Sequence, residues 1–383
     1  MNKEAIDIIM LSNFDRNAGG RETWLYNFLP ELLEDKSIQR INLFGYTNDE
    51  HNNNISSASF LGKKKEIEKR LFPVVFKGKQ SKYPMALAMF NQLKKHKGDN
   101  DVSITLAMGV FELLMMLFIR RFNNTKKVVW LRSIFMHEKA YAIPEFLRKT
   151  ILSIEIYFLR KADIIISNGD DIKSFYEKYG LEISVIKNGI DYKKWKLPSP
   201  TLSKPVHVAY IGRLVQSKGI ESYLELARKV KKGENHFSFI FHIVGNERGY
   251  EEEVKELAKE NIVVNHGVIP NQKLPIFLKS IDVCVALTFA SETGGGGGTS
   301  NAMLEQMAAS RIMLAWDNVI FQQYLNDENA YLAKQYSVQE LSKQLLNILK
   351  NKDEALLKSK NALKSIENYT YYNNVENFKR LVF

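Results

Sequence analysis

Residues 291–307, SETGGGGGTSNAMLEQM, combine a glycine run with the start of a predicted helix. Thr299 or Ser300 is a suitable N-cap, and residues 301–309 are mostly good helix formers. Unpaired N–H groups and the positive dipole end at such a helix start favour an anion such as a phosphate. Glu305 lies one turn into the helix, so we expect its carboxylate beside that anion. This arrangement indicates a ligand with phosphate and hydroxyl groups; a flexible glycine linker and a solvated glutamate are the alternative.

A second candidate site is the pair of cations in GRLVQSK, where four residues separate Arg213 from Lys218 across a predicted strand-to-helix turn. Arginine binds phosphate oxygens through a planar fork, and lysine supplies a point charge. The pair therefore suits a departing diphosphate, whereas a solvated turn is the alternative.

Alternating strands and helices must position these residues. The nearly continuous apolar segment at 283–289 predicts a strand buried on both faces, and it places Cys284 in the core. Further strands are predicted at residues 6–11, 41–46, 102–108, 127–131, 162–167, 207–211, 237–244, 262–265 and 312–316. This alternation predicts α/β architecture with doubly wound parallel sheets, whose ligands bind beyond the carboxyl ends of the strands. Arg132 and His137 follow one such end, so we expect them to face a ligand.

The chain of 383 residues is long enough for two domains. A shift toward lysine, proline and serine at 193–204 predicts the linker between an N-terminal domain at 1–192 and a C-terminal domain at 205–362. Residues 363–383 have helical character and carry aromatic side chains that can pack on a neighbouring domain.

The net charge of +11 is unevenly distributed. Residues 61–161 hold 21 Lys+Arg and 8 Asp+Glu, a balance of +13, which leaves −2 for the rest. The same window contains apolar stretches that we interpret as helices, at 71–76, 111–122 and 146–161. A basic and apolar surface suits anionic lipid headgroups or a phosphate-bearing acceptor. Amphipathic core-facing helices with solvated lysines are the alternative, and we find no nucleic-acid motif that favours a nucleic-acid partner.

The sequence also bears on localisation. No secretory signal is recognisable, and the most lipid-like segment, around 113–119, is shorter than the roughly 20 residues that span a bilayer. The single cysteine is typical of a reducing compartment. We therefore expect a cytoplasmic protein, peripheral on the inner face of the membrane.

Several motifs occur together in a characteristic order: IKNGID at 186–191, GRLVQSKGI at 212–220, VGN at 244–246, HGVIPNQKL followed by IDVCVAL at 266–287, and GTSNAMLEQMA at 298–308. In this order they resemble the retaining GT-B glycosyltransferases of the glycogen-synthase-like group, family 4 in particular. The resemblance runs from about 184 to 329, and over the first 180 residues it rests on GGRE at 19–22 and on the strand order.

The resemblance implies a GT-B fold, with two Rossmann-like domains whose parallel sheets face a cleft and a C-terminal helix that crosses back onto the first domain. It implies that Arg213 and Lys218 neutralise the diphosphate leaving group. It further implies that Glu305 accepts hydrogen bonds from the ribose hydroxyls and that Val268 and Ile269 hold the base through their backbone.

The resemblance also implies donor contacts from backbone groups. The amides of Gly298, Thr299 and Ser300 would contact phosphate and sugar, and Gly20 would approach the phosphates from the other domain. Such enzymes need no metal and no cofactor beyond the nucleotide diphosphate sugar that is their donor. The Asp-x-Asp at 99–101 precedes a predicted strand, which is the wrong end of a sheet for a metal-diphosphate site.

Two departures from the family pattern affect the catalytic assignment. The glutamate expected eight residues before Glu305 is replaced by Gly297, and Glu292 is the candidate substitute. An active-site histidine common after the strand at 127–131 is replaced by Arg132, which leaves His137 as the nearby catalytic candidate.

The hypothesis is a retaining, metal-independent glycosyltransferase. It would move a sugar from a nucleotide diphosphate donor, a UDP-sugar, to a saccharide or lipid-linked saccharide in surface polysaccharide or glycan biosynthesis. The alternative, motivated by Gly297, is a non-catalytic nucleotide-sugar-binding GT-B protein. A Rossmann oxidoreductase is disfavoured because no Gly-x-Gly-x-x-Gly follows the first predicted strand.

Overall fold

The computed structural model describes residues 4–15, 20–47, 56, 59–60, 65–77, 85–96, 101–135, 144–233, 238–246, 249–290 and 301–383. The chain forms two compact units, Met1–Gly189 with Tyr371–Phe383, and Ile190–Thr370. Residues 193–204, where the sequence predicts a linker, fall within the second unit, and its core buries Trp195 and Leu202.

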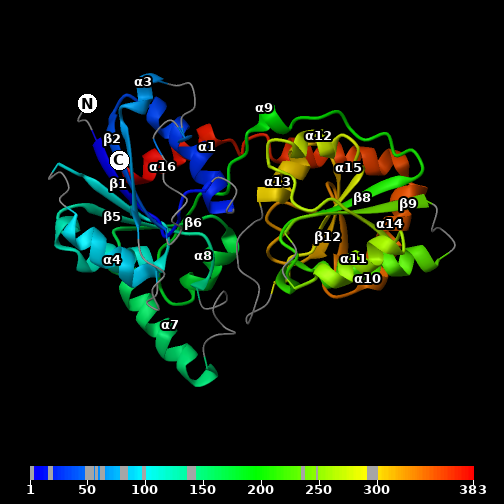
Figure 1. The fold of residues 1–383 in the computed structure, drawn as a ribbon, viewed down its shortest axis with the longest axis horizontal. Helices are drawn as coiled ribbons and strands as arrows, with labels where there is room; N and C mark the ends of the chain where they lie inside the picture. The colour runs from blue at the N-terminus through cyan, green and yellow to red at the C-terminus, as the bar shows by residue number, and fades with distance from the viewer. Residues whose placement is uncertain are drawn as a thin grey trace. The chain divides into compact units, whose positions relative to one another are not determined.

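The first unit is built on a parallel sheet of seven strands in the order β3-β2-β1-β4-β5-β6-β7 (Figure 1). Its strands are β1 (Glu4–Ile9), β2 (Ile38–Thr47), β3 (Leu71–Lys77), β4 (Ile104–Ala107), β5 (Lys126–Leu131), β6 (Ile164–Ser167) and β7 (Ser184–Val185). Its helices are α1 (Gly20–Glu34), α3 (Lys65–Glu68), α4 (Met85–Lys95), α5 (Val110–Phe118), η1 (Arg120–Phe122), α7 (Glu145–Leu159), α8 (Asp170–Glu177) and α16 (Tyr371–Val382).

The prediction of a helix at 71–76 is wrong, because this stretch is the edge strand β3. It pairs in parallel with β2, with Pro73 opposite Leu43. Proline cannot donate a hydrogen bond to a sheet ladder, which an edge strand tolerates on its outer side. The stretch is also short and rich in valine and phenylalanine, which favours a strand.

The second unit is built on a parallel sheet of six strands in the order β10-β9-β8-β11-β12-β13. Its strands are β8 (Val206–Ile211), β9 (Phe239–Val244), β10 (Val263–Asn265), β11 (Val283–Ala286), β12 (Ile312–Asp317) and β13 (Tyr331–Lys334). Its helices are α9 (Tyr192–Trp195), η3 (Gln216–Lys218), α10 (Ile220–Lys232), α11 (Glu251–Lys259), α12 (Leu274–Leu278), α13 (Asn301–Ala308), α14 (Val338–Lys350) and α15 (Lys352–Ser365). In Figure 1, α12 and α15 cover one face of this sheet, and α10 and α11 cover the other.

The predicted α/β class with two units of parallel sheet is confirmed. The central strands of each sheet, such as β4 and β11, are buried on both faces, as the apolar runs predict. All four residues of β11, including Cys284, are buried.

The last helix, α16, belongs to the first unit and packs against α1. The ring of Phe378 lies 5.6 Å from that of Phe28 and 5.8 Å from that of Trp130, measured between centroids. Lys379 forms an ion pair with Asp35 at 2.5 Å. The chain therefore returns to the first unit after completing the second.

No helix in the described part of the chain is both long enough and apolar enough to cross a bilayer.

Candidate functional site

Glycine turns join the carboxyl ends of β8, β9 and β10 in the second unit. The amide of Gly212 donates to the carbonyl of Val244 at 2.9 Å, and that of Gly245 donates to the carbonyl of Gly267 at 2.9 Å. A Cβ at Gly245 would lie 1.8 Å from the carbonyl oxygen of Gly212. The turns after β8 and β9 can therefore approach this closely only with glycine at position 245. The three turns form one edge of the sheet, where parallel sheets bind ligands.

The two predicted cations lie on the turn that follows β8, and Tyr210 fixes that turn. The hydroxyl of Tyr210 lies 2.9 Å from the carbonyl oxygen of Arg213 and 3.2 Å from that of Lys218. Tyr210 is buried, and this burial raises the pKa of its phenol, so the hydroxyl stays a donor at ordinary pH. One buried hydroxyl thus contacts the backbone carbonyls of both cationic residues. Arg213 itself is exposed.

The cation turn also lies against the segment that follows β11. The amide of Phe289 donates to the carbonyl of Ser217 at 3.1 Å. Gly219 has a φ of +75°, and a Cβ there would lie 2.3 Å from the carbonyl oxygen of Leu287. The chain that leads to the glycine run therefore starts beside Arg213 and Lys218.

The glycine run itself lies outside the described residues. The predicted contacts from Glu292, Gly298, Thr299 and Ser300 fall there, and so does the departure at Gly297. The contacts assigned to these residues therefore stay predictions.

Glu305 lies on α13 and is 9% exposed, so the alternative interpretation of a solvated glutamate is wrong. Its Oε1 accepts a hydrogen bond from the Nδ2 of Asn271 at 3.0 Å. Burial raises the pKa of the carboxyl to about 7, against the opposing effects of the Asn271 hydrogen bond and the charge of Lys194. The group can therefore change between acid and carboxylate near neutral pH.

The loop that holds Val268 and Ile269 connects β10 to Asn271. Val268 is 67% exposed, and Ile269 is partly buried against the core. The loop starts with a turn in which the Oδ1 of Asn265 accepts from the amide of Gly267 at 2.9 Å. The structure thus links the predicted base-binding loop to Glu305, through a residue that sequence reasoning missed.

In the first unit, the predicted phosphate contact Gly20 is the exposed first residue of α1. The residues directly after β1 are bound by two buried glutamates. The Ser12 hydroxyl donates to Glu22 at 2.7 Å, and the Leu11 amide donates to Glu112 at 2.8 Å. Glu112 was missed, although an acid in the first turn of a helix that follows a strand end is a recognisable signal.

The other first-unit candidates follow β5. Arg132 donates to the side-chain oxygen of Asn188 at 2.9 Å, and its guanidinium lies 4.8 Å from the ring centroid of Trp24. The structure therefore shows Arg132 bound within its own unit. His137 lies outside the described residues, so its catalytic role stays a prediction.

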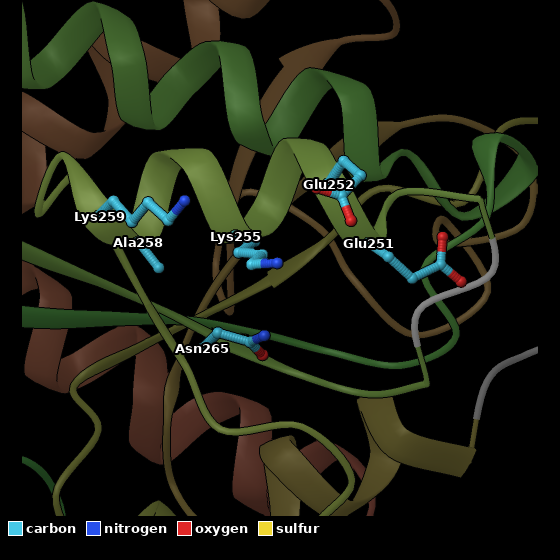
Figure 2. Close-up of a pocket in the computed structure, with 6 residues that line it drawn as sticks. All are labelled: Glu251, Glu252, Lys255, Ala258, Lys259 and Asn265. Atoms are coloured by element: carbon cyan, nitrogen blue, oxygen red, sulfur yellow. The ribbon is translucent and has the colours of Figure 1, made fainter.

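The described residues also bear on two other kinds of site, a metal centre and a surface hollow. Within the described ranges, no group of His, Cys, Asp and Glu is arranged to hold a metal ion. A hollow of about 610 Å³ lies between α11 and β10 (Figure 2). Its lining residues are Glu251, Glu252, Lys255, Ala258, Lys259 and Asn265. This open surface of mixed charge contains none of the predicted site residues.

Comparisons with known proteins concern the second unit and the fold. The family model of glycosyl transferases group 1 matches residues 205–351, which lie within the second unit. A search of the curated proteins found no match.

Solved structures are similar over nearly the whole chain at low identity. TarM, from S. aureus, has a TM-score of 0.77 at 15% identity, covering 99% of this chain and 98% of that one. Sucrose-phosphate synthase from Thermosynechococcus elongatus has a TM-score of 0.75 at 16% identity, with the same coverage. Anabaena Alr3699/HepE in complex with UDP and glucose has a TM-score of 0.73 at 15% identity, covering 98% of each chain. At these identities the likeness shows the fold, and the fold is GT-B.

Proposed function

We propose that the chain is a retaining glycosyltransferase that moves a sugar from a UDP-sugar to a saccharide or lipid-linked saccharide. The observation that carries this proposal is the buried Glu305, bound to the loop of Val268 and Ile269 within the glycosyl transferase group 1 domain. The same unit carries Arg213 and Lys218 on a turn at the carboxyl edge of its sheet. A nucleotide diphosphate has the hydroxyls and phosphates that these groups would bind.

In this proposal the chain's own side chains supply the electrostatic stabilisation. Arg213 and Lys218 neutralise the charge that develops on the diphosphate as the bond to the sugar breaks, a preorganised effect that needs no metal. Glu305 accepts hydrogen bonds from the ribose hydroxyls. The acceptor hydroxyl attacks from the face that the diphosphate leaves, so the anomeric configuration is retained.

Two fold relatives support uridine and a saccharide as partners. Anabaena Alr3699/HepE has been solved with UDP, with UDP and glucose, and with UDP-glucose. TarM of S. aureus has been solved with UDP together with fondaparinux and alpha-GlcNAc-glycerol. We extend UDP-sugar and saccharide to this chain as part of the proposal.

The first unit supports an acceptor presented at a membrane. Its helices α5 and α7 expose large apolar side chains, with Phe118 at 62%, Phe146 at 79% and Tyr157 at 56% exposure. Three aromatic rings of this surface contact one another, since the Phe118 and Phe158 rings are 5.7 Å apart and the Tyr157 and Phe158 rings are 5.3 Å apart. In Figure 1, α7 projects outward from the sheet of its unit.

Cations accompany this apolar patch. The ammonium of Lys161 lies 5.0 Å from the Tyr157 ring centroid. Lys149 on α7 and Arg160 directly after it are exposed. Apolar side chains among cations suit the surface of an anionic bilayer. We therefore place the enzyme on the inner face of the membrane, in surface polysaccharide or glycan assembly.

The test is a thermal-stabilisation screen of nucleotide diphosphate sugars with the wild type beside Glu305→Ala and Arg213→Ala. The proposal predicts that a UDP-sugar raises the melting temperature of the wild type and has a smaller effect on both variants. Stabilisation by no donor, or equal stabilisation of all three proteins, would contradict it. A matched control is Arg228→Ala, which removes a partly exposed arginine of α10 that pairs with Glu253 of α11 in the same unit.

The alternative, a non-catalytic binder of nucleotide sugars, is motivated by Gly297. It predicts the same stabilisation by a donor, but neither hydrolysis nor transfer with any acceptor. Turnover therefore separates the two functions.

A further inference from the structure

The buried carboxyl of Glu305 is the end of a hydrogen-bonded chain of three side chains. The ammonium of Lys194, on α9, donates to the Oδ1 of Asn271 at 2.5 Å. The Nδ2 of Asn271 then donates to the Oε1 of Glu305 at 3.0 Å. Three segments that are far apart in sequence thus meet at this carboxyl.

The chemistry of the first member fixes the orientation of the amide. Lysine only donates hydrogen bonds, so the amide oxygen of Asn271 must face Lys194. The amide N–H therefore faces Glu305 and needs an acceptor there. A carboxylate is a stronger acceptor than a neutral acid, so this orientation favours the ionised form.

Local structure holds Lys194 in place. The side chain of Asp191 caps α9 by accepting from the amide of Lys194 at 3.2 Å. The ammonium lies 4.7 Å from the ring centroid of Trp195, which is buried in the core of the second unit. Asn271 is positioned by the turn before α12, where the amide of Lys273 donates to the carbonyl of Pro270 at 2.8 Å.

We propose that Lys194 and Asn271 are positioning residues that favour the ionised form of Glu305 and orient it toward the ribose of the donor. The ribose role rests on the proposed function. We call the hydrogen-bonded chain of Lys194, Asn271 and Glu305 the relay. The relay rests on the geometry of these three side chains and can be tested without a nucleotide.

The charges around Glu305 agree with this assignment. Burial disfavours the carboxylate, whereas the Asn271 hydrogen bond and the Lys194 charge favour it. Helix α13 packs against α9, β12 and α15. On α9, the neighbouring Lys193 is exposed. On β12, Asp317 is exposed and accepts a hydrogen bond from Gln322. On α15, Lys358 forms an ion pair with Glu354 at 3.4 Å. Among the described residues, Lys194 is the charged side chain that lowers the pKa of Glu305.

The direct experiment is a pH titration of Glu305 in the nucleotide-free protein by NMR. The protein is labelled with 13C at the side-chain carboxyl of glutamate, and the Glu305 signal is assigned with Glu305→Gln. We expect the pKa of Glu305 to rise in Lys194→Met and in Asn271→Ala, and to return toward the wild-type value in Lys194→Arg. Lys193→Met, on the same helix but exposed, is the control and should leave the titration unchanged.

The functional experiment measures UDP affinity of the same proteins against pH. At neutral pH we expect Lys194→Met to bind UDP about fivefold more weakly than the wild type, because a rise of one pKa unit from about 7 leaves about a fifth as much of Glu305 ionised. Raising the pH should recover this affinity, because the variant's Glu305 then ionises. A packing defect would weaken binding equally at every pH.

The outcomes separate the relay from the function. An unchanged Glu305 titration in both Lys194→Met and Asn271→Ala would overturn the relay, whatever binds. A shifted titration together with no UDP binding by the wild type would support the relay and contradict the proposed function. If one variant fails to fold, the other decides, because each removes a different link of the chain.

Discussion

At the scale of single residues, Tyr210 is the side chain on which the cation turn depends. Its hydroxyl contacts the carbonyl oxygens of both Arg213 and Lys218, the two groups assigned to the diphosphate. Tyr210→Phe removes that contact and leaves the ring in the core. We expect a loss of about 1–2 kcal/mol in the free energy of unfolding, and a weaker affinity for UDP because the turn loosens.

The matched control is Tyr223→Phe. The Tyr223 hydroxyl binds the carbonyls of Val208 at 3.0 Å and His242 at 2.8 Å, within the same sheet but on the strands themselves. This variant should lose similar stability and keep its UDP affinity. Denaturant unfolding and calorimetric binding measure both quantities, and equal affinity losses in the two variants would contradict the role of Tyr210.

The residue scale also shows what sequence reasoning can reach. Glu305 and the two cations were identifiable because each lies in a short motif beside a strand end. Tyr210, Lys194 and Asn271 were not, because their roles depend on tertiary contacts. Lys194 and Asn271 are 77 positions apart, and nothing in the local sequence pairs them.

At the scale of elements, a row of three histidines runs from β8 through β9 to the residue that follows β10 in the second sheet. His242 lies between His207 and His266, with nitrogen-to-nitrogen distances of 2.9 Å on both sides. The ring of Phe277 on α12 packs against His242 and His266. A neutral imidazole has one N–H and one acceptor nitrogen, so neutral His242 donates to one neighbouring histidine and accepts from the other.

This row of histidines predicts that stability falls in acid. Burial, with smaller effects from the neighbouring histidines, lowers the pKa of His242 from 6.5 to about 4. Between these values the unfolded chain binds a proton that the folded one does not, so stability is present above pH 6.5 and is lost toward pH 4. We expect His242 to make the protein about 2 kcal/mol less stable at pH 5 than at pH 7.

Urea unfolding at the two pH values measures this effect. His242→Phe should reduce the difference between pH 5 and pH 7, although it also lowers stability at both by leaving two histidines without their partner. His96→Phe, in the first unit, is the control and should keep the wild-type difference. An unchanged pH dependence in His242→Phe would contradict the assignment.

Helix α7 is the element that we assign to the membrane, and its exposed apolar face makes a direct prediction. Replacing Phe146 and Ile154, which are 79% and 50% exposed, by serine should weaken binding to anionic vesicles by about tenfold or more while leaving stability nearly unchanged. Ile276→Ser on α12, where Ile276 is 68% exposed, is the control.

Sedimentation with phosphatidylglycerol vesicles measures this binding, and phosphatidylcholine vesicles show whether charge contributes. Added salt should weaken the wild-type interaction. The assignment would be contradicted if the serine variant and the wild type sedimented equally, or if the patch caused self-association in place of vesicle binding.

Among the elements, short or unusual segments were the hardest to predict. Most of the parallel strands followed from the alternation of apolar runs with helices. The edge strand β3 was mistaken for a helix because its few apolar residues lack a clear period, and the short strand β13 gave no recognisable signal. Partner strands stabilise both, and a single sequence does not show them.

At the scale of the whole molecule, the chain contributes its last helix to the unit in which it began. Phe378→Ala removes a fully buried ring that packs on Phe28 and Trp130, and should cost about 3–5 kcal/mol. The loss should fall on the first unit. Hydrogen exchange measured by mass spectrometry should show reduced protection in the first-unit strands and little change within residues 190–370.

The control for this prediction is Phe383→Ala, because Phe383 is 48% exposed. It should leave protection in both units close to that of the wild type. Equal losses in the two units after Phe378→Ala would show that the last helix does not stabilise the first unit selectively.

The central claim is sugar transfer from a UDP-sugar, and turnover tests it most directly. We would incubate the protein with UDP-glucose and candidate saccharide acceptors, and follow release of UDP and the anomeric configuration of the product by NMR. The account predicts UDP release with an α-configured product, and a loss of about 100-fold or more in kcat for Arg213→Ala. A β-configured product would contradict retention. UDP-sugar binding without UDP release in any acceptor mixture would contradict catalysis and favour the non-catalytic alternative.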